Sequence, residues 1–166
     1  KETITPDGGL RTGDLGHLDS EGYLYITGRV KEQYKLDIGE YVAPAPLEET
    51  LKLSAYIDQV MLYGFNRPNN VALIVVAMPA VAQYAQSNGI SGSGENLLKE
   101  SEIRDLFRKE LSVYGKDFKS FEHPQNFALL AEEWSIDNGL LTPTLKLKRE
   151  VVEQKFKDQI ESLYSE

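Results

Sequence analysis

One apolar run constrains the fold of this chain more than any other feature. Val71–Met78 is rich in β-branched and apolar residues and carries no charged side chain. A strand of this composition is typical of a sheet interior, where both faces are covered. Ile57–Phe65 has a similar composition, and the turn-forming Asn66–Asn70 separates the two runs, so together they predict a β-hairpin. Even extended to Val81, the apolar stretch is far too short to span a bilayer.

Helical patterns surround this hairpin. Pro44 and Pro46 precede a predicted helix over Leu47–Ala55, since proline suits a helix start. Further helices are predicted over three ranges, Pro79–Ser87, Leu97–Tyr114 and Glu150–Tyr164. Short strands are predicted over Tyr34–Leu36 and Tyr41–Val42, a longer one over Phe127–Trp134, and a flexible linker over Asn88–Asn96. The elements do not alternate as regular βαβ units. The expected fold class is therefore α+β, a small mixed or antiparallel sheet of about three strands flanked by helices.

The first thirty residues differ in composition from the rest. Glycine and aspartate cluster in turn signals, and short apolar pieces such as Tyr23–Ile26 lie between them, which predicts strands joined by turns. Thirty residues cannot bury a core alone, so residues 1–30 are expected to be a β-hairpin segment of another domain and residues 31–166 a separate domain. The chain also starts at Lys1 instead of a methionine, directly before a dense motif, which suggests a fragment.

Composition excludes several classes of function. The chain has no cysteine, which excludes a disulfide scaffold, a thiolate metal site and a cysteine nucleophile. His17 and His123 lie far apart, which argues against a histidine metal cage. The net charge of −8, from 18 basic and 26 acidic residues, argues against nucleic-acid binding, because such binding needs a basic surface.

Two stretches near the start carry polar groups suited to a ligand. Asp14, between Gly13 and Gly16, can present its carboxylate to ligand hydroxyls, or it can simply cap a turn. Arg29, which follows Gly28, can fork onto a ribose diol or a phosphate, or it can form a surface salt bridge.

Two later stretches have the same double interpretation. Gly39 lies in the extended segment Lys35–Pro44, where a glycine marks either a close approach of a ligand or a bent strand. If Thr142–Arg149 is extended, Lys146 and Lys148 share one face, and Leu145 and Leu147 share the other. A lysine there can deliver positive charge to a phosphoryl or carboxyl oxygen. The alternatives are a solvated basic patch or a site for an anion or anionic lipid.

The order and spacing of these motifs carry more information than any one of them. The series is Thr12-Gly13-Asp14, Asp19–Leu24, Gly28-Arg29-Val30-Lys31, Gly39–Pro44 with Glu48, and Thr142–Arg149. It resembles the C-terminal part of the adenylate-forming acyl-CoA synthetase superfamily, which includes firefly luciferase, 4-coumarate ligases and the adenylation domains of peptide synthetases. Gly39–Pro44 and Leu141–Arg149 are most similar to the long-chain fatty acyl-CoA synthetases.

The resemblance implies a two-step reaction. A fatty acid attacks the α-phosphate of Mg-ATP to give an acyl-adenylate and pyrophosphate, and CoA then releases AMP and forms acyl-CoA. A large N-terminal adenylation domain would hold most of the ATP, Mg²⁺ and CoA contacts, and a small C-terminal lid domain would rotate between the steps. Residues 1–30 would be the tail end of the former and residues 31–166 the latter.

The resemblance also implies roles for individual residues. Asp14 and Arg29 would contact the ribose, and Lys31 would be the hinge. Gly39 and Glu40 would lie in the loop that faces CoA. Lys146 would be the catalytic lysine, and no metal ligand is implied in this chain. Many relatives have glycine where this chain has Leu145, which leaves Lys148 as the alternative. Lys146 is favoured because it keeps the spacing from Thr142-Pro143-Thr144 and to Arg149.

The implied partners are the chain's own N-terminal domain and the small molecules fatty acid, ATP and CoA, with no nucleic acid. The chain alone is expected to be inactive, and the full-length enzyme to be cytoplasmic with peripheral membrane contact allowed. Two alternatives are a stand-alone lid module acting in trans and a ligase for another carboxylate, medium-chain or aryl.

Overall fold

A three-stranded sheet forms the centre of the protein in a computed structural model, which describes residues 3–165. Strand β6 (Asn70–Val76) lies in the middle, antiparallel to β5 (Ile57–Tyr63) and parallel to β7 (Pro124–Leu130). Every residue of β6 is buried, as the apolar run predicts. The expected α+β class, with a small mixed sheet of three strands flanked by helices, is confirmed.

The side chains of β6 divide between two hydrophobic clusters on opposite faces of the sheet. Ala72, Ile74 and Val76 belong to the first cluster, and Val71, Leu73 and Val75 belong to the second. Successive side chains of a strand point to opposite faces, so a continuous apolar run supplies both clusters at once.

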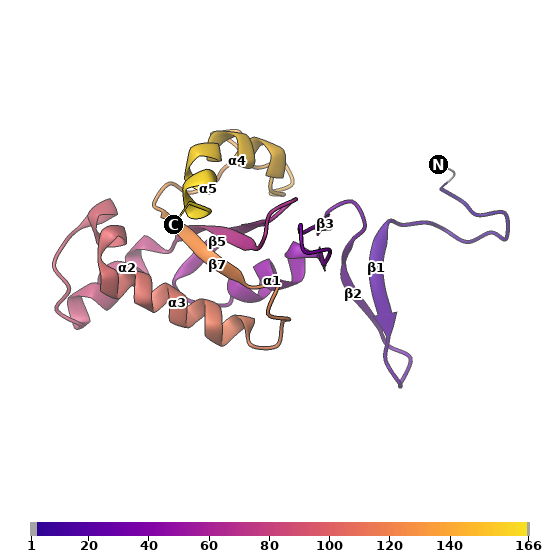
Figure 1. The fold of residues 1–166 in the computed structure, drawn as a ribbon, viewed down its shortest axis with the longest axis horizontal. Coiled ribbons are helices and arrows are strands. Elements are labelled where there is room, and N and C mark those ends of the chain that lie inside the picture. Colours follow the sequence, from indigo (N-terminus) through magenta and orange to yellow (C-terminus); the bar gives the residue numbers. More distant parts are fainter. Residues whose placement is uncertain (1–2, 166) are drawn as a thin grey trace.

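Helices cover both faces of the sheet (Figure 1). Four elements contribute to the first cluster: α1 (Pro44–Leu51), α2 (Met78–Ser87), the 3₁₀ helix η1 (Gly94–Lys99) and α3 (Ser101–Gly115). The second cluster is covered by α4 (Arg149–Lys155) and α5 (Lys157–Leu163). None of the helices in residues 3–165 is long and apolar enough to cross a membrane.

Three predicted helices have different bounds in the structure. The predicted Leu47–Ala55 helix ends at Leu51. It begins earlier than predicted, at Pro44, because proline is compatible with the first helical turn. The predicted Leu97–Tyr114 helix is divided by Glu100, whose backbone is extended. The predicted closing helix is divided at Phe156, although bonds from Phe156 to Val152 and from Ile160 to Phe156 keep the two halves continuous.

Two smaller sheets precede the central one. Strands β1 (Asp14–Leu18) and β2 (Leu24–Arg29) form an antiparallel hairpin, and Figure 1 shows it at the end of the molecule remote from α2. Strands β3 (Tyr34–Lys35) and β4 (Tyr41–Val42) form the second pair. The hairpin expected in residues 1–30 is therefore present. Several of its apolar residues are 60–67% exposed, among them Leu18, Tyr23, Leu24 and Ile26.

The structure predicts how much stability the central strand contributes. Leu73 is fully buried in β6, so Leu73→Ala should lower the free energy of unfolding by about 2–5 kcal/mol through lost burial and a residual cavity. Leu53, which is 71% exposed, provides the matched control, and Leu53→Ala should change stability by less than about 0.5 kcal/mol. Urea denaturation of the chain measures both. Equal effects of the two substitutions would contradict the central position of β6.

Candidate functional site

A cavity of about 830 Å³ lies where the β1–β2 hairpin meets α1 and the segment that precedes α4. Asp14, Arg29 and Lys146 all line it, although more than a hundred residues separate the first two from the third. The structure thus brings together three of the six site residues that the sequence suggests. Lys31, Gly39 and Glu40 are not on the wall of this cavity.

Asp14 and Arg29 form an ion pair across the hairpin. They are direct partners in the β1–β2 register, and the Arg29 Nε atom lies 3.1 Å from the Asp14 Oδ1 atom. The Arg29 side chain is 57% exposed and the Asp14 side chain is 27% exposed, so the pair contributes little to stability. Its effect is to orient the carboxylate, which can accept hydrogen bonds from ligand hydroxyls. The surface salt bridge and the ligand contact proposed for Arg29 are therefore compatible.

Lys146 lies on a tight turn instead of a continuous extended segment. The Leu145 amide donates to the Thr142 carbonyl oxygen at 2.8 Å, and the Thr142 amide donates to the Lys146 carbonyl oxygen at 2.8 Å. The Lys146 amide donates to the Thr142 hydroxyl at 3.0 Å. Leu141 and Leu147 then form an antiparallel bridge. These bonds hold the backbone of Lys146 from both sides and leave its side chain exposed.

The turn corrects one expectation from the sequence. Leu145 and Leu147 do not share a face, because Leu145 is 70% exposed while Leu147 packs against the second cluster. Lys146 lines the cavity, and Lys148 does not. The Lys148 amide instead donates to the Leu140 carbonyl oxygen at 2.9 Å, beside the start of α4.

Leu145 has a backbone conformation that suits glycine. Its φ of 60° lies in the left-handed region, where a side chain at Cβ is disfavoured. The position is the one at which the resembling family often has glycine. The turn geometry explains that preference, since glycine adopts this conformation without strain.

Glu48 and Arg149 form a partly buried ion pair that the sequence does not reveal. The Glu48 residue is 6% exposed, and its carboxylate accepts hydrogen bonds from the Leu62 amide at 2.7 Å and from the Arg149 guanidinium. Burial raises the pKa of the Glu48 carboxyl, and Arg149 and the Leu62 amide oppose that rise. Glu48 is part of the motif series, but only the tertiary structure shows its partner. Both residues line the cavity.

Lys31 lies in the turn between β2 and β3. Before it, the Val30 amide donates to the Gly13 carbonyl oxygen at 2.9 Å, which ties that residue to the hairpin. After it, the Tyr34 hydroxyl donates to the Asn70 side-chain oxygen at 2.7 Å, which ties the chain to β6. Burial raises the pKa of the Tyr34 hydroxyl, so the phenol stays protonated and can donate. Lys31 therefore lies between two anchored points, one on the β1–β2 hairpin and one on the central sheet.

Gly39 and Glu40 lie at the turn that joins β3 to β4. Gly39 has a φ of 96°, and a Cβ atom added there would meet nothing within 4 Å. Both residues are exposed. Glycine is therefore favoured here by the backbone conformation, while the space around it is open. The contact with CoA that the resemblance implies remains a prediction.

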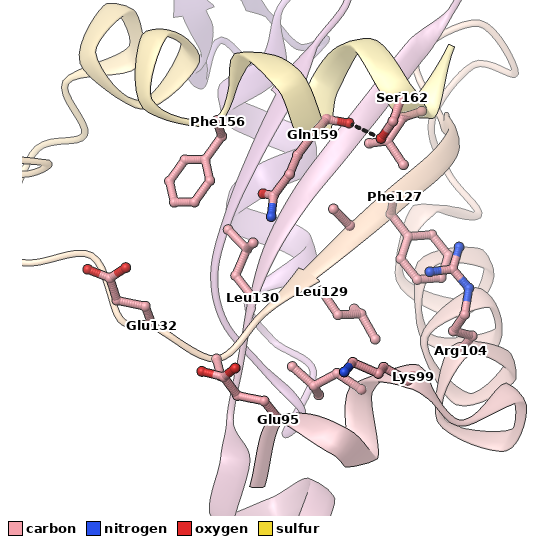
Figure 2. A pocket seen from close by; sticks show the side chains of 14 residues that line it. Glu95, Lys99, Arg104, Phe127, Leu129, Leu130, Glu132, Phe156, Gln159 and Ser162 are labelled. Carbon is pink, nitrogen blue, oxygen red and sulfur yellow. Dashed lines mark hydrogen bonds between the residues drawn. The ribbon is translucent and has the colours of Figure 1, made fainter. Parts of the chain in front are cut away.

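A second cavity, of about 490 Å³, lies beside the edge strand β7 and under α5 (Figure 2). Its labelled wall combines apolar groups such as Leu129 and Phe156 with charged groups such as Glu132 and Arg104. It contains none of the six site residues that the sequence suggests.

Some groups on the wall of the first cavity have the chemistry to contact a nucleotide. The Asp14 carboxylate can accept hydrogen bonds from ribose hydroxyls, and Arg29 and Lys146 can bind anionic oxygens. Within residues 3–165, no group of three or more histidine or acidic side chains is arranged to hold a metal ion.

The backbone at Leu145 leads to a prediction about stability. Leu145→Ile should lower the free energy of unfolding by about 1 kcal/mol, because a β-branched side chain is strained at positive φ. Leu145→Gly should leave it unchanged or raise it by up to about 1 kcal/mol, since the lost side chain is exposed and glycine relieves the strain. Urea denaturation of the two variants tests this. A more stable Ile variant than Gly variant would show that the turn has another conformation.

Comparison with known proteins identifies the group to which the chain is related. No protein-family model matches the chain. Long-chain-fatty-acid–CoA ligase 6 of Rattus norvegicus is 39% identical over 168 residues, and long-chain-fatty-acid–CoA ligase 1 of Cavia porcellus is 37% identical over 167 residues. Each alignment covers 99% of this chain and 24% of the relative. The chain thus spans about a quarter of the length of these relatives.

Solved structures share the fold. The adenylation domain of a carboxylate reductase from Mycobacterium chelonae has a TM-score of 0.78 and 27% identity, covering 99% of this chain and 24% of that chain. The corresponding domain from Segniliparus rugosus, in complex with AMP and a co-purified carboxylic acid, has a TM-score of 0.76 and 25% identity, covering 98% and 24%. Sequence and fold agree along almost the whole length. The chain is therefore related, over almost its whole length, to about a quarter of the long-chain-fatty-acid–CoA ligases, and it shares the fold of adenylation domains.

Proposed function

We propose that this chain is the C-terminal lid of a long-chain fatty acid–CoA ligase, preceded by the last strands of the N-terminal adenylation domain. The observation that carries the proposal is the cavity shared by Asp14, Arg29 and Lys146. A ribose-binding carboxylate and a lysine from a distant turn meet there. Such a meeting is what an adenylate-forming site requires.

The cavity residues act on the first half-reaction. The fatty acid carboxylate attacks the α-phosphate of bound ATP, and pyrophosphate leaves as the α–β phosphoanhydride bond breaks. Asp14 holds the ribose hydroxyls, and Arg29 keeps the Asp14 carboxylate oriented. The Lys146 ammonium stabilises the negative charge that develops between carboxylate and phosphate, as a preorganised cation does in a site of this kind. Among residues 3–165 no ion pair with an acidic side chain neutralises Lys146, so its charge is free for the ligand.

The second half-reaction uses a different face of the lid. Gly39 and Glu40 lie on an exposed turn away from the cavity. A rotation at Lys31 would exchange this turn with Lys146 at the active site. The attachments that flank Lys31 support a hinge there, since few residues absorb the torsion change in hinge motions.

The exposed surface of the β1–β2 hairpin supports the presence of a partner domain. Leu18, Tyr23, Leu24 and Ile26 are 60–67% exposed, and exposed apolar patches mark interaction sites. The relatives are about four times longer than this chain, which leaves room for a large domain. The isolated chain is then inactive, because most contacts with ATP, Mg²⁺, CoA and fatty acid lie on that domain.

A ligase for another carboxylate is the second candidate, because the structural neighbours include carboxylate reductase adenylation domains. A substrate screen on the full-length protein by ATP–pyrophosphate exchange separates the two. We expect exchange to be fastest with long-chain fatty acids and CoA-dependent product to form. Exchange with aryl or medium-chain acids alone would favour the second candidate.

Lys146 should be essential for adenylation. In the full-length protein, Lys146→Ala should lower fatty acid-dependent ATP–pyrophosphate exchange by about 10²–10³-fold, because a preorganised charge is lost from the transition state. Thiolysis of preformed acyl-adenylate should persist. Lys148→Ala is the matched control, since Lys148 lies two residues away but outside the cavity wall. Loss of exchange in Lys148→Ala alone would assign the catalytic role to Lys148. Normal exchange in both variants would show that neither lysine of this turn is catalytic.

Gly39 should affect the other half-reaction. Gly39→Ala should slow acyl-CoA formation from preformed acyl-adenylate by about tenfold or more, because a methyl group enters the path of the thiol substrate. ATP–pyrophosphate exchange should change less than about threefold. Gly89→Ala controls for backbone strain, since Gly89 also has a positive φ, of 68°, and open space around it. If both variants slow the thioester step equally, strain is the cause and the assignment of Gly39 is wrong.

A further inference from the structure

The partly buried pair of Glu48 and Arg149 connects two parts of the lid that are distant in sequence. Glu48 lies in α1, and Arg149 is the first residue of α4, three residues after Lys146. The Arg149 Nη1 atom also lies 3.5 Å from the Leu62 carbonyl oxygen, so both polar groups of the Leu62 backbone face the pair. The arrangement fixes the start of α4 against α1 and β5.

Lys146 is joined to this pair by a short, rigid segment. The Lys148 amide donates to the Leu140 carbonyl oxygen, and Leu147 forms a bridge with Leu141. Arg149 therefore anchors one end of the segment that carries the Lys146 turn, and Leu140 and Leu141 anchor the other end. The turn itself has little other support on its outer side, because Leu145 and Lys146 are exposed.

The pair also determines which cation is available to a ligand. Arg149 and Lys146 line the same cavity, and both could bind a phosphate oxygen. The Glu48 carboxylate holds the guanidinium, whereas Lys146 forms no ion pair within residues 3–165. A buried ion pair is seldom needed for stability, since apolar residues of similar volume often replace it without loss. The place of this pair beside the cavity suits a positional role.

We propose that Glu48 is a positioning residue for Lys146, acting through Arg149. The inference rests on the proposed function of Lys146. Glu48 touches no reacting atom; it keeps Arg149 paired and the Lys146 turn in register with the cavity. We expect the turn at Gly39 and Glu40 to keep its position without this pair, because it lies between β3 and β4 and contains neither Glu48 nor Arg149.

The test uses Glu48→Gln in the full-length protein. Glutamine keeps the size of the side chain and an oxygen that can accept from the Leu62 amide, but it loses the charge that pairs with Arg149. We expect kcat for ATP–pyrophosphate exchange to fall about 10- to 100-fold, the usual effect of a misplaced catalytic group. KM for ATP should change less than about threefold, and thiolysis of preformed acyl-adenylate less than about twofold.

A second background separates positioning from a general structural effect. When Lys146→Ala is already present, Glu48→Gln should not lower the residual exchange rate further, because there is no ammonium left to position. The matched control is Glu161→Gln, which removes another ion pair between distant segments, that of Glu161 with Arg67, away from the first cavity. It should leave exchange within about twofold of the original protein.

Each outcome decides between the alternatives. Normal exchange in Glu48→Gln overturns the positioning role, and so does an equal loss of exchange and thiolysis or a further loss in the Lys146→Ala background. If Lys146→Ala itself keeps normal exchange, the proposed function of Lys146 fails first. Should Glu48→Gln fail to fold in a thermal melt, Arg149→Lys keeps the charge but loses the forked contact and should show the same selective loss of exchange.

Discussion

Burial of β6 on both faces is the constraint on which the rest of the structure depends. One strand supplies alternate side chains to two clusters, so each face of the sheet needs its own cover. The first cluster recruits α1 and α3, and the second recruits α4 and α5. The packing of these helices on the two faces of the sheet determines where the surface sites lie. Although α1 and α4 cover opposite faces, Arg149 at the start of α4 reaches Glu48 in α1.

Three of the pieces of chain that line the cavity carry the residues discussed above. The hairpin provides Asp14 and Arg29, α1 provides Glu48, and the turn before α4 provides Lys146. The charges on its wall are not equivalent. Arg29 and Arg149 are paired with carboxylates, and Lys146 remains unpaired within residues 3–165. This distribution suits a site in which one ammonium acts on an anionic ligand while paired groups hold the geometry.

Much of the fold could be predicted from residue patterns. The apolar run at Val71–Met78 predicted a strand buried on both faces, and β6 confirms it. Helix ends were harder to predict, because Glu100 and Phe156 interrupt patterns that remain periodic on either side. Those interruptions depend on local backbone geometry. The turn at Leu145 was missed for the same reason, since no glycine marks its positive φ.

The sequence by itself determined the class of fold, the order of the motifs and the candidate residues Asp14, Arg29 and Lys146. Apolar periodicity and motif spacing are local properties that a linear chain displays directly. Only the tertiary structure decided that these residues line one cavity and that Glu48 pairs with Arg149. Partners a hundred residues apart are brought together by the packing of helices on a sheet, which no local pattern records.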